Sequence, residues 1–226
     1  MAPTDLSGAT GGWFVSTFPG TVVTNATGTA PDGVGASQTL TVTSAGGDQR
    51  VQQNDGPVPN DTNPSTSIWF IEKTTADPNY LSVGLEFYGG TSYHVTRAVI
   101  NTNTGGISAI TSGNGEACVV TSAGVLSNYW RVQFTSNNNG TGNTGLAFSL
   151  YPTYNNDGTL SENILIGSKT VYGCNVFVGQ SNAGSFIPTH STLTDYTYTS
   201  AGAVTLGQVP LATASLDWDG TGVSVG

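Results

Sequence analysis

Hydrophobic and polar residues alternate with a period of two over short segments that recur along most of this chain. A period of two places alternate side chains on opposite faces of a strand, so each segment predicts a β-strand with one face toward a core. Turns rich in Gly, Asn and Asp separate the segments, and no window shows the 3.6-residue period of a helix. The pattern predicts an all-β, antiparallel sandwich. The clearest alternating segments are 38–43, 81–87, 130–135, 146–151 and 172–178.

The same pattern predicts which side chains point inward. In segment 81–87 the alternate apolar positions should face the core, which leaves Glu86 pointing outward. Two denser apolar runs, 68–71 and 95–100, predict strands that are covered on both faces. The predicted inward residues of segment 81–87 are Leu81, Val83, Leu85 and Phe87.

Composition supports strands and turns over helices. Of the 226 residues, 8% are charged, 37% are hydrophobic and 31 are Gly, while the good helix formers are scarce. Three polar stretches predict loops. They are an irregular crossing over 54–67, a turn over 136–144 that is too poor in apolar groups to pack, and an exposed loop over 154–161.

The alternating pattern restarts after Pro188 and predicts a small C-terminal β-hairpin module. We therefore expect a sandwich over 1–189, which the length can supply with a real core, and a module over 190–226. A hairpin of about 30 residues is marginally stable alone, so it should dock on the sandwich or on a neighbouring subunit. We favour an assembly contact with a neighbour, because large aromatic side chains would otherwise be exposed. These are Tyr196, Tyr198 and Trp218.

The charge pattern excludes several classes of partner. The net charge is −9, and the five basic residues are scattered, so no basic patch for nucleic acid is expected. An anionic membrane surface would repel the chain, and no apolar run approaches the length of about 20 residues that spans a bilayer. The first twelve residues lack the basic and apolar regions of a signal peptide, so synthesis in the cytoplasm is expected.

One stretch, 172–189, has a more specific pattern: a strand, a Gly179-Gln180 break and a polar exit that ends in Ser-Phe-Ile-Pro-Thr. It resembles the last strand and exit segment of a jelly-roll family found in bacteriophage tail and head-fibre proteins. Other segments that resemble this family, in the expected order over about residues 10–189, are Trp13, 21–26, Ala-Pro-Asp-Gly at 30–33, 67–73, 103–105, 129–132 and 156–159. The chain departs from the family at 178–181, where the usual Trp and Leu-Glu are missing.

The resemblance implies an antiparallel jelly-roll β-sandwich in a non-enzymatic virion surface protein of the tail, fibre or head fibre, contacting other virion proteins and host surface glycans. It also implies a homo-oligomer, with a trimer by analogy with fibres. The alternative is a capsid decoration or cement protein that stabilises the shell and has no ligand of its own. A third hypothesis is a polysaccharide depolymerase.

Tyrosines give the candidate ligand-binding residues, because sugar rings stack on aromatic faces beside polar groups. Tyr88 and Tyr93, across the Gly89-Gly90 turn, could form one platform. A second platform could combine Tyr151 and Tyr154 with polar residues of the following loop. The alternative, which we favour for each pair, is that these tyrosines cover sandwich edges. The polar residues of the second platform are Asn155, Asn156 and Asp157.

Catalytic and metal chemistry have little support in the sequence. No nucleophile elbow is present, and His94 and His190 show no metal-ligand spacing, so no cofactor is expected. Calcium could bind 155–158, but the EF-hand spacing is missing and a solvated turn is favoured. Cys118 and Cys174 are interpreted as buried thiols, with pairing left open. Depolymerase activity needs two close carboxylates, and the candidates are Glu72, Glu86, Glu116 and Glu162.

Overall fold

The computed structural model describes residues 13–15, 22–29, 36–46, 49–123, 128–155, 157–161, 164–181, 195–198, 204–207, 214–217 and 222–225. The chain divides into two compact units, 1–188 and 189–226. The sequence-based boundary lies between 189 and 190. No helix among the described residues is long and apolar enough to cross a lipid bilayer.

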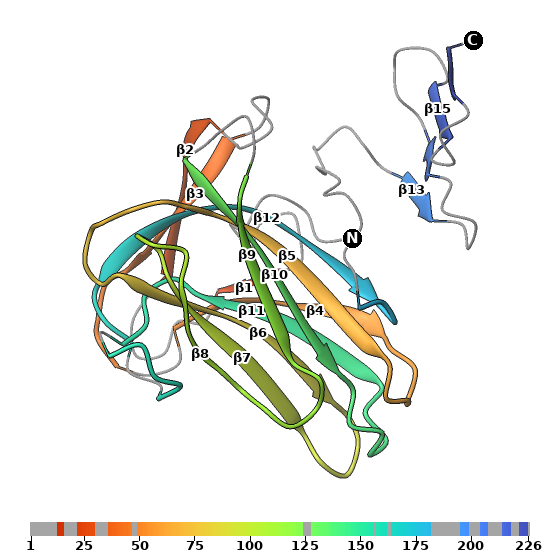
Figure 1. Ribbon diagram of the computed structural model, residues 1–226, viewed down its shortest axis with the longest axis horizontal. Helices are drawn as coiled ribbons and strands as arrows, with labels where there is room; N and C mark the ends of the chain where they lie inside the picture. The colour runs from red at the N-terminus through yellow and green to blue at the C-terminus, as the bar shows by residue number, and fades with distance from the viewer. Residues whose placement is uncertain are drawn as a thin grey trace. The chain divides into compact units, whose positions relative to one another are not determined.

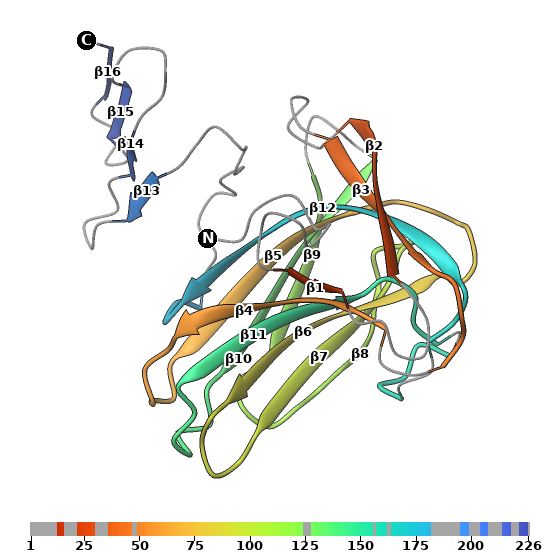
Figure 2. The ribbon, with the colours of Figure 1, turned by 180° about the vertical axis from the view of Figure 1, so that it is seen from behind.

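The first unit is a β-sandwich of two six-stranded antiparallel sheets, as the alternating pattern predicts (Figure 1). The first sheet has the order β1 (Trp13–Val15), β4 (Val51–Pro57), β11 (Gly145–Tyr151), β6 (Tyr80–Tyr88), β7 (His94–Asn101) and β8 (Ile107–Ile110). The second sheet has the order β2 (Val22–Thr29), β3 (Ala36–Val42), β12 (Gly167–Val178), β5 (Pro64–Glu72), β10 (Tyr129–Asn137) and β9 (Ala117–Ser122). Strands β5, β9 and β10 of the second sheet are nearer the viewer in Figure 1. The first sheet is nearer the viewer in Figure 2, which shows the molecule from behind.

The main core lies between the two sheets and is built from the alternate positions of their strands. All four predicted inward residues of segment 81–87 are fully buried there. Trp69 of β5 packs its ring edge-on against Phe148 of β11, with 6.3 Å between ring centroids, and so joins the two sheets. Other buried members of this core are Leu40, Val42, Val51, Ile71, Ala98, Ile100, Val132, Phe134, Leu146, Leu150 and Val171.

A second apolar cluster explains why segment 68–71 is apolar at every position. The side chains of strand β5 point alternately into the main core and into a cluster on the outer face of the second sheet, so both faces of the strand are buried. The chain turns back onto this face after β12, where the carbonyls of Gln180 and Ser181 accept hydrogen bonds from Thr66 and Thr135. The cluster consists of Ile68, Phe70, Tyr129, Tyr172 and Phe177.

The loop predicted over 54–67 is much shorter than the sequence suggested. Strand β4 continues to Pro57 and strand β5 begins at Pro64, so only 58–63 lie outside strands. Proline lacks a backbone N–H and is tolerated at the ends of strands, and both prolines occupy such positions. The prolines therefore limit the two strands without forming the long irregular crossing that the composition suggested.

The second unit contains a four-stranded antiparallel sheet in sequence order: β13 (Asp195–Tyr198), β14 (Val204–Gly207), β15 (Ala214–Asp217) and β16 (Gly222–Val225). Tyr196 and Tyr198 are in β13, whose side chains the structure does not describe, and Trp218 lies outside the described residues. The predicted assembly contact of these three residues stays a prediction.

Candidate ligand-binding face

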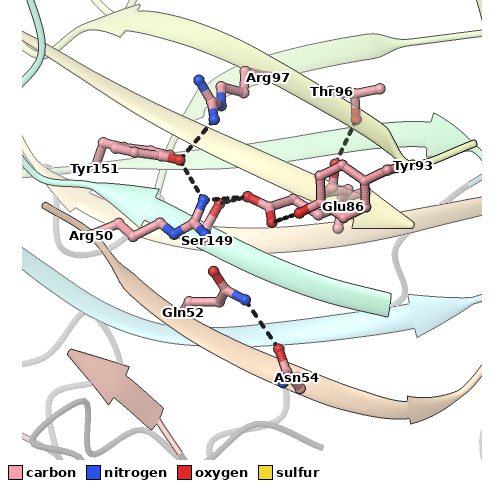
Figure 3. A network of polar contacts seen from close by, with 10 residues as sticks. Arg50, Gln52, Asn54, Glu86, Tyr93, Thr96, Arg97, Ser149 and Tyr151 are labelled. Atoms are coloured by element: carbon pink, nitrogen blue, oxygen red, sulfur yellow. Dashed lines mark hydrogen bonds and ion pairs between the residues drawn. The ribbon is translucent and has the colours of Figure 1, made fainter. Parts of the chain in front are cut away.

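The outer face of the first sheet carries a group of polar side chains, which we call the polar face. It is formed by positions that alternate with the core positions of β4, β6, β7 and β11. On β6, for example, Glu86 lies between the core residues Leu85 and Phe87 and therefore points to the other side. The residues of the polar face are Arg50, Gln52, Asn54, Glu86, Tyr93, Arg97, Ser149 and Tyr151 (Figure 3).

A buried carboxylate lies at the centre of the polar face. The Glu86 side chain is only 1% exposed, and its Oε1 accepts a hydrogen bond from Arg50 Nη1 at 2.6 Å in an ion pair. Its Oε2 accepts from the Tyr93 hydroxyl at 2.5 Å, and Ser149 Oγ lies 3.5 Å from Oε1 (Figure 3). The sequence correctly predicts that Glu86 points away from the core, but its carboxylate is covered by these partners instead of being solvated.

The two arginines of the polar face converge on one hydroxyl. Arg50 Nη1 and Arg97 Nη2 donate to the Tyr151 hydroxyl at 2.6 and 2.8 Å. The same guanidiniums lie over the Tyr151 ring, at 5.7 and 4.7 Å from its centroid, in cation–π geometry. Tyr151 is completely buried, because its ring belongs to the main core cluster beside Tyr154 and the two arginines lie over it.

A glycine makes room for one of these arginines. Gly84 is paired with Arg97 on one side and Ser149 on the other. A Cβ atom at Gly84 would lie 3.0 Å from Ser149 Oγ and 3.3 Å from Arg97 Cγ. The missing side chain therefore allows Arg97 to extend across β6 toward Tyr151.

The accessible part of the polar face consists of the Tyr93 ring and two amide side chains of β4. Tyr93 is 56% exposed, Asn54 is exposed and Gln52 is half-buried. Gln52 Nε2 donates to Asn54 Oδ1 at 3.0 Å (Figure 3). Desolvation of the Tyr93 hydroxyl and its hydrogen bond to Glu86 raise the pKa of Tyr93, so the hydroxyl remains a donor at neutral pH.

The loop that carries Tyr93 is bonded to the loop before β11. Thr91 N donates to Thr141 O at 2.9 Å, and Gly90 N donates to Asn143 Oδ1 at the same distance. Ser92 O accepts hydrogen bonds from Asn143 Nδ2 and Thr141 Oγ1 at 2.8 and 3.0 Å. The prediction that 136–144 is too poor in apolar groups to pack is wrong, because Asn143 is completely buried and its amide is hydrogen-bonded to the neighbouring loop.

The platform predicted at Tyr88 and Tyr93 is present only in part. Tyr93 is exposed, as stacking on a sugar requires. Tyr88 is half-buried, with its ring so close to Gly145 that a Cβ there would lie 2.4 Å from Tyr88 Cε2. One of the two tyrosines is therefore available as an open aromatic surface.

The platform predicted at Tyr151 and Tyr154 is wrong, because both side chains are completely buried. Their rings pack edge to face with centroids 5.8 Å apart, and the Tyr154 hydroxyl donates to Leu160 O at 3.0 Å. The loop over 154–161 is exposed only in part, since Asn155 is also buried and donates to Thr159 O and Ser161 O. Neither tyrosine can stack on a ligand.

The remaining polar residues of that predicted platform form a turn. Asp157 is exposed, and its Oδ1 accepts hydrogen bonds from Thr159 N and Thr159 Oγ1, both at 2.9 Å, which lower the pKa of the carboxyl. Asn156 lies outside the described residues. Among the residues that the structure describes, no group of three or more His, Cys, Asp or Glu side chains could hold a metal ion.

The candidate carboxylates do not come together as a pair. Glu72 lies on the outer face of the second sheet, opposite Tyr129, whereas Glu86 lies on the outer face of the first. Glu116 accepts a hydrogen bond from Asn114 N in the connection between β8 and β9. Glu162 and His190 lie outside the described residues. The three described glutamates therefore occupy separate surroundings.

Cys118 carries a free thiol on strand β9. Its side chain packs against the main core, and this burial raises the pKa of the thiol to about 12. The thiolate is the reactive form of cysteine, so Cys118 is inert near neutral pH. The side chain of Cys174 lies outside the described residues.

His94 predicts a measurable pH dependence of stability. Its Nε2 lies 3.0 Å from Asn114 Nδ2 and 3.7 Å from Glu116 Oε1. Desolvation lowers the pKa of His94 below 6.5, and Glu116 opposes this only in part. The unfolded chain then binds more protons than the folded one just below pH 6.5, so stability should fall as the pH falls through this range.

We expect His94→Gln to reduce this loss. Melting temperatures of the wild type and the variant, measured between about pH 7.5 and 5.5, should show a smaller decrease for the variant. A decrease that is equal or larger in His94→Gln would contradict the assignment.

Sequence reasoning missed the arginines and amides of the polar face. Arg50 and Arg97 are two of only five Lys and Arg residues in the chain. The scarcity of these residues was the one sequence signal that could have marked the two arginines as candidates for a site. They are 47 positions apart, and only the pairing of β4, β11, β6 and β7 brings them together.

No known protein family model matches the chain, and no curated protein matches it. The resemblance to phage fibre proteins therefore stays a prediction.

Proposed function

We propose that this protein is a non-enzymatic surface protein of a bacteriophage virion, in the tail, fibre or head fibre, whose polar face binds glycans of the host surface. The observation that carries the proposal is the exposed Tyr93 ring, bonded to Glu86, on the same face as two guanidiniums that Glu86 and Tyr151 hold. An apolar ring with a few fixed polar groups around it is the combination that orients a sugar.

The chemistry of the polar face suits hydroxyl-rich ligands. The Tyr93 ring offers an apolar surface to the C–H face of a pyranose. The side chains of Gln52 and Asn54 can donate to and accept from hydroxyl groups. Because Arg50 and Arg97 are fixed by Tyr151, little side-chain entropy is lost when a ligand binds beside them.

Binding without catalysis is supported by the bonding of Glu86. Glycoside hydrolysis generally uses two carboxyl groups on either side of the scissile bond. In the described network Glu86 is the only carboxylate, and both of its oxygens already accept hydrogen bonds from Arg50 and Tyr93. We therefore propose that Glu86 positions the polar face and does not act on the ligand.

The order of the strands supports the jelly-roll part of the proposal. The central four strands of the sheets follow the orders β3-β12-β5-β10 and β4-β11-β6-β7. Strands that are consecutive among these eight thus alternate between the two sheets, except β6 and β7, which are neighbours in the first sheet. The first and last of the eight, β3 and β12, are also neighbours. This arrangement is expected for eight strands wound as a jelly roll.

The virion location is supported by the ordered series of phage-like segments in the sequence. Many copies of the protein on one particle would compensate for weak binding at each polar face. The partners would be other virion proteins and further copies of this chain. The second candidate, a capsid decoration protein, is supported by the separate C-terminal unit, which could serve as an anchor on the shell.

Substitution of Tyr93 tests glycan binding. An array of bacterial surface polysaccharides and neutral oligosaccharides identifies a bound glycan, and titration calorimetry then compares variants. We expect Tyr93→Ala to weaken binding at least about fivefold, by analogy with the stacking of a base on one aromatic ring, which contributes about 1–3 kcal/mol. Tyr93→Phe, which keeps the ring, should bind more tightly than Tyr93→Ala.

Ile166→Ala is the matched control, because Ile166 is 62% exposed and lies next to β12 of the second sheet. It should bind like the wild type. A wild type that binds no glycan on the array would overturn glycan binding and favour the decoration protein. Cryo-electron microscopy of the virion would then be expected to show the chain on the capsid lattice, with the C-terminal unit between shell subunits.

A further inference from the structure

Among the strands that the structure describes, two neighbouring ones at one side of the sandwich form open sheet edges. Strand β8 ends the first sheet and strand β9 ends the second, and the two strands lie close to each other (Figure 1). Both carry exposed apolar side chains: Ile107 is 43% exposed and Val119 is 49% exposed. An edge strand presents backbone N–H and C=O groups that can pair with a further strand.

This side of the sandwich lacks the charges that usually protect an edge. Between Ala98 and Asn128 the sequence contains one charged residue, Glu116, whose side chain is 2% exposed. Natural proteins commonly place lysine or proline on edge strands to prevent pairing with another chain. Neither residue type occurs in β8 or β9. The strands are neutral although the whole chain has a net charge of −9.

The register of β9 on β10 shows which backbone groups face outward. Ala123 N donates to Tyr129 O at 3.0 Å, so these two residues form a hydrogen-bonded pair. In an antiparallel ladder such pairs alternate with pairs that are not hydrogen-bonded. The backbone groups of Cys118, Val120 and Ser122 are therefore directed away from β10, toward the open edge.

The side chains of β9 are divided between the core and the surface. Cys118 and Val120 pack against the main core, and Val119 lies between them on the outer face of the second sheet. Two described basic groups lie beside β9: Arg131 is opposite Thr121, and Lys73 Nζ donates to Ser122 Oγ at 3.0 Å. Glu72 lies on the same outer face of the second sheet, opposite Tyr129. The acidic residues that give the chain its net charge do not occur on β9.

We infer that two copies of this chain pair through β9, antiparallel and related by a two-fold axis, so that the second sheet continues from one copy into the other. A second copy is the favoured occupant because it presents an identical edge strand that is neutral and contains no lysine or proline, so the two strands can pair without bringing like charges on β9 together. An isologous contact of this kind needs no complementary charge on the partner.

The test uses charge at Val119 in the full chain. The outward backbone groups can pair in two registers that overlap most of β9, one centred on Val119 and one centred on Val120. In the first register Val119 of one copy lies opposite Val119 of the other, and in the second the two side chains are diagonal neighbours. We expect Val119→Glu and Val119→Lys each to weaken the pair at least tenfold by like-charge repulsion. Mixing the two variants should restore it, because glutamate then faces lysine. Ile166→Glu, on a more exposed apolar residue near β12, should leave the pair unchanged.

Light scattering after size-exclusion chromatography measures the result, with melting temperatures to confirm that each variant is folded. The wild type should have twice the 23.1 kDa mass of the chain. A wild type that stays monomeric at about 100 μM, where a weak pair would be populated, would overturn the inference. So would a trimeric mass, or an unchanged mass in both Val119 variants, because association would then use another surface.

Discussion

Replacing Glu86 with alanine should destabilise the sandwich by about 3 kcal/mol and abolish ligand binding on the polar face. The carboxylate is 1% exposed and accepts hydrogen bonds from Arg50 and Tyr93. Without it, the Arg50 guanidinium loses the ion pair with Glu86 while its side chain remains only 18% exposed. Removing one member of a buried ion pair costs more than the pair itself contributes, and the partial exposure of Arg50 places the loss at the lower end of the usual range.

Urea unfolding followed by tryptophan fluorescence measures this loss. Glu86→Gln, which keeps the shape and one acceptor oxygen, should cost about 1 kcal/mol. Glu116→Ala is the control, because it also removes a buried glutamate side chain but breaks no ion pair with an arginine. It should cost less than Glu86→Ala, because the neighbour of Glu116 is a histidine with a lowered pKa instead of an arginine.

A double substitution separates the stability effect from the role in binding. Arg50→Met combined with Glu86→Leu removes both charges and should be more stable than Glu86→Ala, because neither member of the ion pair is left without the other. The same double variant should still fail to bind the glycan, because the Arg50 donor and the Glu86 carboxylate that holds Tyr93 are lost. A double variant that binds like the wild type would show that Arg50 and Glu86 serve the fold alone.

The strands could be predicted well from the sequence, because the alternation of apolar and polar residues along a strand follows directly from which of its side chains are buried. In segment 81–87 all four apolar positions reach the core, and 68–71 is buried on both faces. These predictions need only the neighbouring residues of the same strand. No knowledge of the partner strands is required to make them.

The polar face could not be predicted in the same way, because its burial depends on distant residues. Alternation places both Glu86 and Tyr151 on the outer face, where solvent exposure is the ordinary expectation. Arg50 covers both of them from 36 and 101 positions away in the sequence. The loop over 138–144 is similar, since its burial comes from amide hydrogen bonds to Ser92 and not from apolar residues. Local composition contains no signal for either arrangement.

Substitution of Gly90 by alanine should disrupt the position of Tyr93 while leaving every residue of the polar face unchanged. A Cβ atom at Gly90 would lie 2.5 Å from both Asn143 N and Thr141 O. These are backbone atoms, so no side-chain rotation can relieve the contact, and the two loops must separate. We expect a loss of about 2–3 kcal/mol, as for other overpacked sites.

The loss should include ligand affinity, because separation of the loops breaks the hydrogen bonds that hold Thr91 and Ser92 beside Tyr93. Gly106→Ala is the matched control: a Cβ there meets only the Thr104 hydroxyl, at 3.1 Å, in the turn before β8. It should change stability by no more than about 0.5 kcal/mol and leave glycan binding intact.

If Gly90→Ala loses stability but binds the glycan like the wild type, the ligand does not depend on the placement of Tyr93, and the polar face is not the binding site. A loss of affinity in Gly90→Ala under conditions where the variant is fully folded, with none in Gly106→Ala, would instead assign binding to the geometry of this loop.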